Sequence, residues 1–127
     1  MALYIQALDE VSLKEGLRIA IIDISAEGNG YLQEQKPWDH LKAGDKKRCD
    51  TIIALSLNLT VLLGAILEPF LPSFTEKLLR QLDYHHIPIP DVFSLDLIPA
   101  GHKIGIPKTL FRKMEAEEIK GWREVFG

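Results

Sequence analysis

Residues 51–67 carry no charged side chain, and this run of 17 residues limits the possible folds of the chain more than any other feature. Its length reaches the lower limit for a helix that spans a membrane. Polar residues and a glycine interrupt the run, however, and Glu68–Pro69 ends it. A helix that is apolar around most of its circumference is also expected at the buried centre of a helical bundle. We favour the bundle and expect no membrane as a partner.

The residues before this run also have a helical pattern. Apolar residues in the range 4–8 look like the last turn of a helix whose beginning is missing. Ser12 followed by Glu15 forms a capping-box pattern at the start of a second helix. Apolar side chains then recur at spacings of three and four, which predicts a helix over about 13–35. Its expected weak or bent point is Gly28–Asn29–Gly30, because glycine destabilises a helix interior.

The central helix itself is expected over about 46–68, with Asp45 placed to cap its first turn. Ser73 and Glu76 form a second capping-box pattern, which predicts a short amphipathic helix that ends near Leu82. The side chains expected to be mostly buried along the central helix are Leu55, Leu59, Leu62 and Ile66.

The last third of the chain is different in kind. Prolines and glycines recur through residues 83–107, which predicts an ordered loop or an extended segment and no helix. A final helix is expected over 115–126, with Ile119, Trp122 and Phe126 on one stripe. The expected fold is all-α: an antiparallel helical bundle with an extended C-terminal segment and a final helix. We assign residues 1–82 to the bundle core, with a truncated first helix, and residues 83–127 to an extended loop and a docking helix of the same domain.

Charge and residue chemistry exclude several classes of function. Fifteen Lys and Arg against 18 Asp and Glu give a formal charge of −3, so any RNA contact must be a local site on a mildly acidic body. The lone Cys49 excludes an internal disulfide and a multi-cysteine zinc site, and we interpret it as a structural thiol. His85–His86 are adjacent and project in different directions, so we predict no metal site. No catalytic residues are expected either.

Four residues near the end of the second helix form the candidate site. Asn29 and Gln33 are four apart and therefore share a helix face. Pro37 is expected to end the helix and to fix the backbone that presents Trp38. An exposed indole stacks on unpaired bases, and nearby amides read hydrogen-bonding edges of a base. The alternative is that Trp38 is a core aromatic that closes the helix corner.

Three sequence blocks carry a resemblance to a known family. The run NGYLQEQKPW, residues 29–38, resembles the Asn-x-Tyr…Pro-Trp signature of the anticodon-binding domain of methionyl-tRNA synthetases. Residues 67–77 resemble the helix-break-helix segment of that family, and residues 97–115 are similar to its Gly-His-Lys-Ile-Gly…Leu-Phe-x-Lys block. The three blocks follow the order of the family, and they look more like eukaryotic cytosolic members than bacterial ones.

The resemblance implies a cytoplasmic class I enzyme that joins methionine to its tRNA with ATP and Mg²⁺. In that family this domain reads the CAU anticodon. By position, Trp38 would stack on an anticodon base, Pro37 would set its pose, and Asn29 would lie in the same binding face. Gln33 stands where some bacterial members have an acidic residue that helps to reject other tRNAs. The tail around 102–114 would pack back along the domain towards the catalytic half.

The chain has no His-Ile-Gly-His-like or Lys-Met-Ser-Lys-Ser-like motif, so the resemblance covers a partial anticodon-binding domain without its catalytic domain. We therefore expect no cofactor and no catalysis in this chain. The implied partners are the anticodon of methionine tRNA, the catalytic domain of the same polypeptide, and other synthetases or scaffold proteins. The alternative function is a helical protein-interaction module of a multi-synthetase assembly that does not bind RNA. An exposed Trp38 flanked by Asn29 and Gln33 favours RNA binding, whereas a buried Trp38 favours the alternative.

Overall fold

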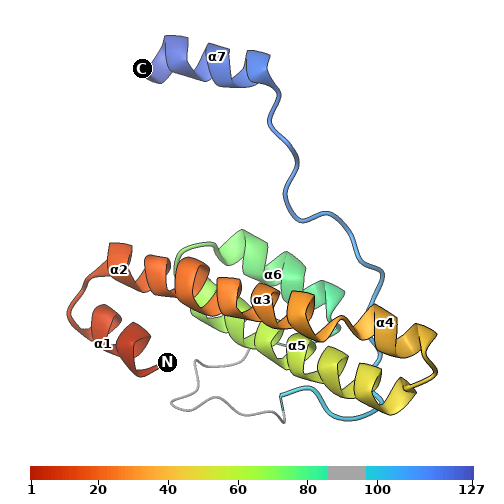
Figure 1. The fold of residues 1–127 in the computed structure, drawn as a ribbon. Helices are drawn as coiled ribbons and strands as arrows, with labels where there is room; N and C mark the ends of the chain where they lie inside the picture. The colour runs from red at the N-terminus through yellow and green to blue at the C-terminus, as the bar shows by residue number, and fades with distance from the viewer. Residues whose placement is uncertain (86–96) are drawn as a thin grey trace.

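The computed structural model describes residues 1–85 and 97–127, and within these ranges its regular structure is entirely helical. The predicted all-α bundle is therefore confirmed. Figure 1 shows the helices of the bundle lying side by side, with an extended chain leading away to the last helix. The elements are α1 (Ala2–Asp9), α2 (Leu13–Arg18), the π-helical η1 (Ile19–Ser25), α3 (Ala26–Gln35), α4 (Pro37–Lys42), α5 (Lys46–Leu67), α6 (Pro72–Gln81) and α7 (Ala116–Phe126).

The centre of the bundle is α5, as the uncharged run predicts. It packs against η1, α3, α4 and α6. The carboxylate of Asp45 accepts a hydrogen bond from the Arg48 backbone N–H at 3.1 Å, which confirms the predicted cap. By length and composition α5 meets the criteria for a membrane span. In the bundle, however, Ile52, Val61 and Ile66 are fully inaccessible to solvent, which is how a core helix of a globular domain is buried.

Buried polar groups fix the neighbouring helices on α5. The Tyr4 hydroxyl donates to the Ile66 carbonyl, and the Thr75 hydroxyl donates to the Gly64 carbonyl at 3.0 Å. Burial raises the pKa of the Tyr4 hydroxyl. Buried hydroxyls that are satisfied in this way fix register as well as adding stability. The apolar cluster around these bonds comprises Tyr4, Ala7, Ile19, Ala20, Leu62, Ile66 and Leu67.

The predicted helix over 13–35 is continuous, but its irregular part lies elsewhere than expected. Residues 19–25 are π-helical, whereas Gly28–Asn29–Gly30 are regular α-helix within α3. Gly28 allows α3 to pack closely on α5 and does not bend α3. A Cβ on Gly28 would overlap the Leu59 side chain of α5. The bend expected at Gly28–Asn29–Gly30 is therefore wrong, since glycine also allows close approach of two helices. That the glycines weaken the helix stays a prediction.

Both predicted capping boxes are wrong. The Ser12 side chain makes no capping hydrogen bond within the described part of the chain, and Glu15 is instead bonded to Arg18, at 2.8 Å. The Arg18 guanidinium lowers the pKa of Glu15. Helix α6 begins one residue before Ser73, so that side chain already lies inside the first turn. A capping box does form at α7, between Glu115 and Glu118, where none was predicted.

The tail follows the prediction along only part of its length. Residues 86–96 of the predicted segment lie outside the described residues. Residues 97–101 form bends and a turn, and residues 102–109 have no regular secondary structure. The Gly105 backbone N–H donates to the Gln81 carbonyl at 2.8 Å, which holds this segment on the bundle. The rings of Phe74 and Phe111 stack with centroids 4.9 Å apart. In contrast, α7 lies away from the bundle in Figure 1 and does not dock on it. Its predicted stripe is exposed, with Trp122 57% accessible to solvent.

Two of the four side chains predicted to be buried on α5 are only half-buried. Leu62 and Ile66 lie in the core, but Leu55 and Leu59 line an apolar groove between α5 and the η1–α3 stretch. Their outer faces lie at this groove, so truncating either of them removes fewer contacts.

Replacing Ile66 with Ala is expected to lower the free energy of unfolding by about 2–5 kcal/mol, because a fully enclosed cavity is created. Leu59→Ala should cost less, since the site is already open on one side. Urea unfolding of both variants measures the difference. Equal losses would contradict the assignment of Leu59 to the groove.

Gly30→Ala is expected to stabilise the chain by about 0.4–1 kcal/mol, because no atom lies within 4 Å of the added methyl group and alanine favours the helix. Gly28→Ala is the matched variant in the same helix, and it should gain less or lose stability because Leu59 must move. Thermal unfolding followed by circular dichroism compares the two variants. A Gly28→Ala variant as stable as Gly30→Ala would show that the contact with Leu59 yields without cost.

Candidate functional site

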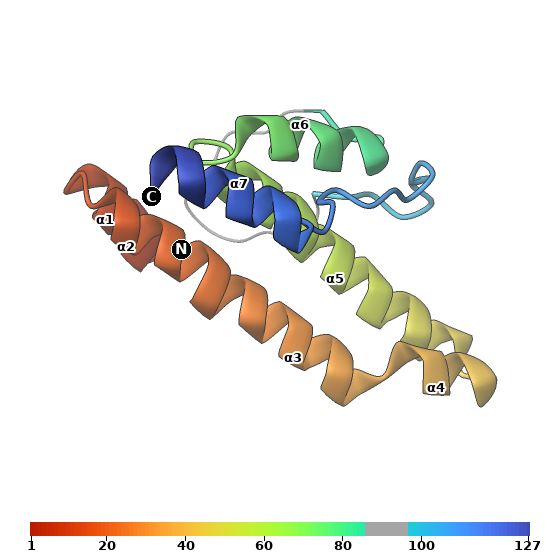
Figure 2. The same cartoon turned by 90° about the horizontal axis from the view of Figure 1, so that it is seen from above.

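The candidate site lies at the corner between α3 and α4 (Figures 1 and 2). Gln35 is the last residue of α3, and Lys36 follows in a left-handed conformation with φ 42° and ψ 64°. Pro37 is the first residue of α4, where its fixed φ suits a helix start and its missing N–H is not needed. Pro37 is buried and Trp38 is 44% exposed. One residue anchors the corner while the next presents an indole to solvent.

Helix α4 has six residues, too few to be stable alone, so its pose depends on its contacts with α5. At its end, the Asp45 backbone N–H donates to the His40 carbonyl at 2.9 Å. At its beginning, Arg48 Nη2 donates to Gln35 Oε1 at 2.6 Å. Both contacts involve the first turn of α5 or its cap. Sequence reasoning missed α4, although a proline followed by a cationic last turn is a signal for a short helix.

The structure places the other two predicted site residues on α3. Asn29 and Gln33 are both exposed, as a binding role requires. Gln33 lies about 3 Å and Asn29 about 9 Å along the helix axis from the last residue of α3, at 1.5 Å per residue. In the described part of the chain, neither amide is hydrogen-bonded to Trp38. The corner therefore brings together Gln33, Pro37 and Trp38 near one helix end, with Asn29 further along the same helix.

Cationic residues are concentrated in the segment that carries the exposed indole. Between residues 36 and 48, five Lys or Arg side chains stand against two Asp. Lys46 pairs with Asp50 at 2.8 Å, and that carboxylate raises the pKa of Lys46. The remaining lysines of this segment, Lys36, Lys42 and Lys47, are exposed and make no ion pair with any residue that the structure describes. The net charge of the whole chain concealed this local excess, which a sum over short windows reveals.

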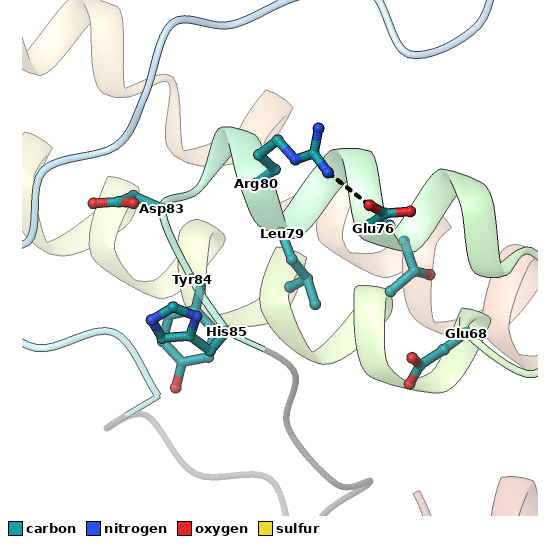
Figure 3. A pocket seen from close by; sticks show the side chains of 8 residues that line it. Glu68, Glu76, Leu79, Arg80, Asp83, Tyr84 and His85 are labelled. Carbon is teal, nitrogen blue, oxygen red and sulfur yellow. Dashed lines mark hydrogen bonds and ion pairs between the residues drawn. The ribbon is translucent and has the colours of Figure 1, made fainter.

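His85, the first histidine of the pair predicted to bind no metal, lies at a second site, shown in Figure 3. His85 and Tyr84 lie beside a pocket whose other wall carries Glu68, Glu76 and Arg80. The last two form an ion pair at 2.6 Å, which Figure 3 marks with a dashed line. His86 lies outside the described residues. Among residues 1–85 and 97–127 no cluster of His, Cys, Asp and Glu suits a metal ion.

The lone thiol is placed as the sequence suggests. Cys49 is 8% exposed in the first turns of α5, and it is not bonded in a disulfide. Its location inside the bundle agrees with the interpretation as a structural side chain.

Comparison with known proteins gives one family. Residues 1–127 match the family model described as the anticodon binding domain of methionyl tRNA ligase. A probable cytoplasmic methionine–tRNA ligase of Dictyostelium discoideum is 44% identical over 97% of this chain. Cytoplasmic methionine–tRNA ligases of Arabidopsis thaliana and Homo sapiens are 37% and 35% identical over 99% and 98% of it. The chain spans 14–17% of the length of these three relatives.

Removing the cap of α5 tests how the corner is anchored. Asp45→Ala is expected to lower the free energy of unfolding by about 1 kcal/mol, because the Arg48 N–H loses its acceptor. Ser12→Ala is the control, since that hydroxyl makes no capping bond, and it should change stability less. Chemical unfolding of both variants measures the difference. If Ser12→Ala costs as much as Asp45→Ala, the capping assignments are wrong.

Proposed function

Because the chain belongs to the family of anticodon-binding domains of methionyl tRNA ligases, we propose that it binds the anticodon of methionine tRNA through the α3–α4 corner. Trp38 stacks on one unpaired anticodon base, and Pro37 sets the direction of the indole. The single observation that carries this proposal is the exposure of Trp38 beside a buried Pro37. A tryptophan that only closed a core would be covered.

Charge around the corner supports an anionic partner. Lys36 precedes α4, Lys42 is its last residue, and Lys47 lies in the first turn of α5. None of the three forms an ion pair with a carboxylate of the described residues. RNA binding uses such cations to neutralise phosphates, which gives affinity without reading sequence. Bases are read by stacking and by hydrogen bonds to their edges. The corner offers both kinds of group on one side of a mildly acidic domain.

Asn29 and Gln33 supply the hydrogen-bonding part of the proposal. Each side-chain amide carries donors and an acceptor, so it matches the edge of an unstacked base. Both residues are exposed on α3. Asn29 lies in the binding face. Gln33 is neutral, so it contacts the RNA without the repulsion between a carboxylate and a phosphate that an acidic residue at this position would cause.

For a protein of the length of these relatives, we propose the activity that their names print, ligation of methionine to tRNA in the cytoplasm. ATP and Mg²⁺ are proposed from the resemblance to the synthetase family alone. The anticodon domain then acts by positioning the tRNA for a catalytic domain elsewhere in the polypeptide.

A protein-interaction role is the second candidate, and two apolar surfaces favour it. One is the groove where Tyr31, Leu55 and Leu59 meet, and the other is the exposed stripe of α7. Exposed apolar surface of this kind is typical of contacts with other protein segments. Trp38 is part of neither surface, so RNA binding and protein contacts do not compete for it.

Trp38→Ala is expected to weaken binding of a stem-loop RNA with a CAU loop by about five- to 150-fold, which corresponds to 1–3 kcal/mol for one stacked base. Fluorescence titration of labelled RNA measures the affinity, and a loop of altered sequence measures the discrimination. Trp122→Ala is the matched control, because it removes the other exposed tryptophan of the chain, which lies on α7.

The proposal predicts loss of binding and of discrimination in Trp38→Ala, with a melting temperature close to that of the unaltered chain. A large fall in melting temperature with unchanged discrimination would show that Trp38 is structural. Equal losses of affinity in Trp38→Ala and Trp122→Ala would place the RNA elsewhere.

A further inference from the structure

Lys36 is the single residue between α3 and α4, so its backbone sets the angle between the two helices. It is at once the C-terminal cap of α3 and the N-terminal cap of α4, with φ 42°. Left-handed backbone is unfavourable for a residue with a Cβ, and such strain persists only where the surroundings enforce it. Lysine has no intrinsic preference for this conformation, and glycine would adopt it freely. The contacts around Lys36 must therefore hold the corner in place.

The contact that crosses the corner joins Gln35 to Arg48. Arg48 Nη2 donates to Gln35 Oε1 at 2.6 Å, which ties the last residue of α3 to the first turn of α5. The Arg48 backbone N–H also donates to Asp45, the cap of that helix. Within residues 1–85 and 97–127, Arg48 forms no ion pair with a carboxylate. Its guanidinium is bonded to a neutral amide, an arrangement that fixes geometry without neutralising charge.

We propose that Gln35, Lys36 and Arg48 form a corner clamp that holds α4 in one pose and so keeps the Trp38 indole ready to stack. This inference rests on the proposed function, in which Trp38 contacts an RNA base. The three are positioning residues and need not touch the RNA. Since α4 is too short to hold its own pose, the clamp supplies the order that RNA binding would otherwise have to create.

The consequence is a loss of affinity without a loss of fold. When the clamp is opened, α4 and its indole sample more orientations, and binding must restrict them again. Ordering one mobile side chain on binding reduces affinity by about two- to tenfold. Opening the clamp is therefore expected to weaken RNA binding less than removing Trp38 does. The apolar cluster around Leu62, Ile66 and Leu67 lies near the other end of α5 and is left intact.

Gln35→Met tests the clamp, because it removes the acceptor of the Arg48 bond without changing charge or length. Trp122→Phe in all proteins leaves Trp38 as the one tryptophan of the chain. We expect affinity for the CAU stem-loop to fall about two- to tenfold and the fluorescence anisotropy of Trp38 in the free protein to fall as well. A merely stabilising bond would change the melting temperature but leave the indole equally ordered. Arg48→Met combined with Gln35→Met should weaken binding no more than Arg48→Met alone.

Lys36 provides a second test that does not depend on the Arg48 bond. Lys36→Gly and Lys36→Asn both remove the charge, but asparagine tolerates the left-handed backbone while restricting it more than glycine does. We expect Lys36→Gly to bind the RNA more weakly than Lys36→Asn. Val11→Gly is the matched control, because Val11 is also left-handed, with φ 56°, in the turn between α1 and α2. It should leave RNA affinity and Trp38 anisotropy unchanged.

The outcomes separate the clamp from the proposed function. If Trp38→Ala leaves binding of the CAU stem-loop unchanged, the proposed function fails and the clamp fails with it. If Trp38→Ala weakens binding, but Gln35→Met alters neither affinity nor anisotropy and Lys36→Gly binds the RNA as tightly as Lys36→Asn, only the clamp is wrong. An effect of Val11→Gly as large as that of Lys36→Gly would also overturn it, since the cause would then be general loosening.

Discussion

Burial of α5 is the constraint on which the rest of the structure depends. A helix with 17 uncharged residues is stable in water only if other helices cover it, and η1, α3, α4 and α6 do so. Tyr4 and Thr75 then fix the register of their helices by donating to carbonyls of α5. The charged residues of this helix are confined to its first five positions, Lys46–Asp50, whereas its last turns are apolar and buried. The candidate site uses the first end, where Asp45 and Arg48 lie.

The division of work between Pro37 and Trp38 follows from this arrangement. Two adjacent residues point to different environments, so one is buried against the bundle and the other is left in solvent. An exposed indole adds little burial to the stability of α4. This short helix therefore depends on its packing against α5. The proposed recognition is thereby separated from stability: the core around Ile66 supports the fold, and the exposed indole at the corner is not part of that core.

The C-terminal segment adds surfaces of another kind. Residues 97–111 run along the bundle, where Gln81 bonds with both its amide nitrogen and its oxygen to the backbone of Lys108. Beyond that anchor, α7 presents Trp122 and Phe126 to solvent. The proposed RNA site and the apolar stripe of α7 are formed by different elements. One domain of this size therefore combines an aromatic, cationic corner with separate apolar faces.

The sequence by itself determined the elements whose signals are local. The uncharged run predicted α5, Asp45 predicted its cap, and the blocks around Trp38 and His102 indicated the family.

Prediction from the sequence failed where backbone geometry or residues distant in the sequence determine the structure. Ser12 and Ser73 have capping patterns, but whether a hydroxyl caps depends on where the helix begins. The Gln35–Arg48 bond joins residues 13 positions apart, and the contact of Gly28 with Leu59 exists only after α3 has packed on α5. Spacings of three and four report on one helix face, whereas the pose of α4 and the exposure of Trp38 are set by a neighbouring helix that only the tertiary structure brings into place.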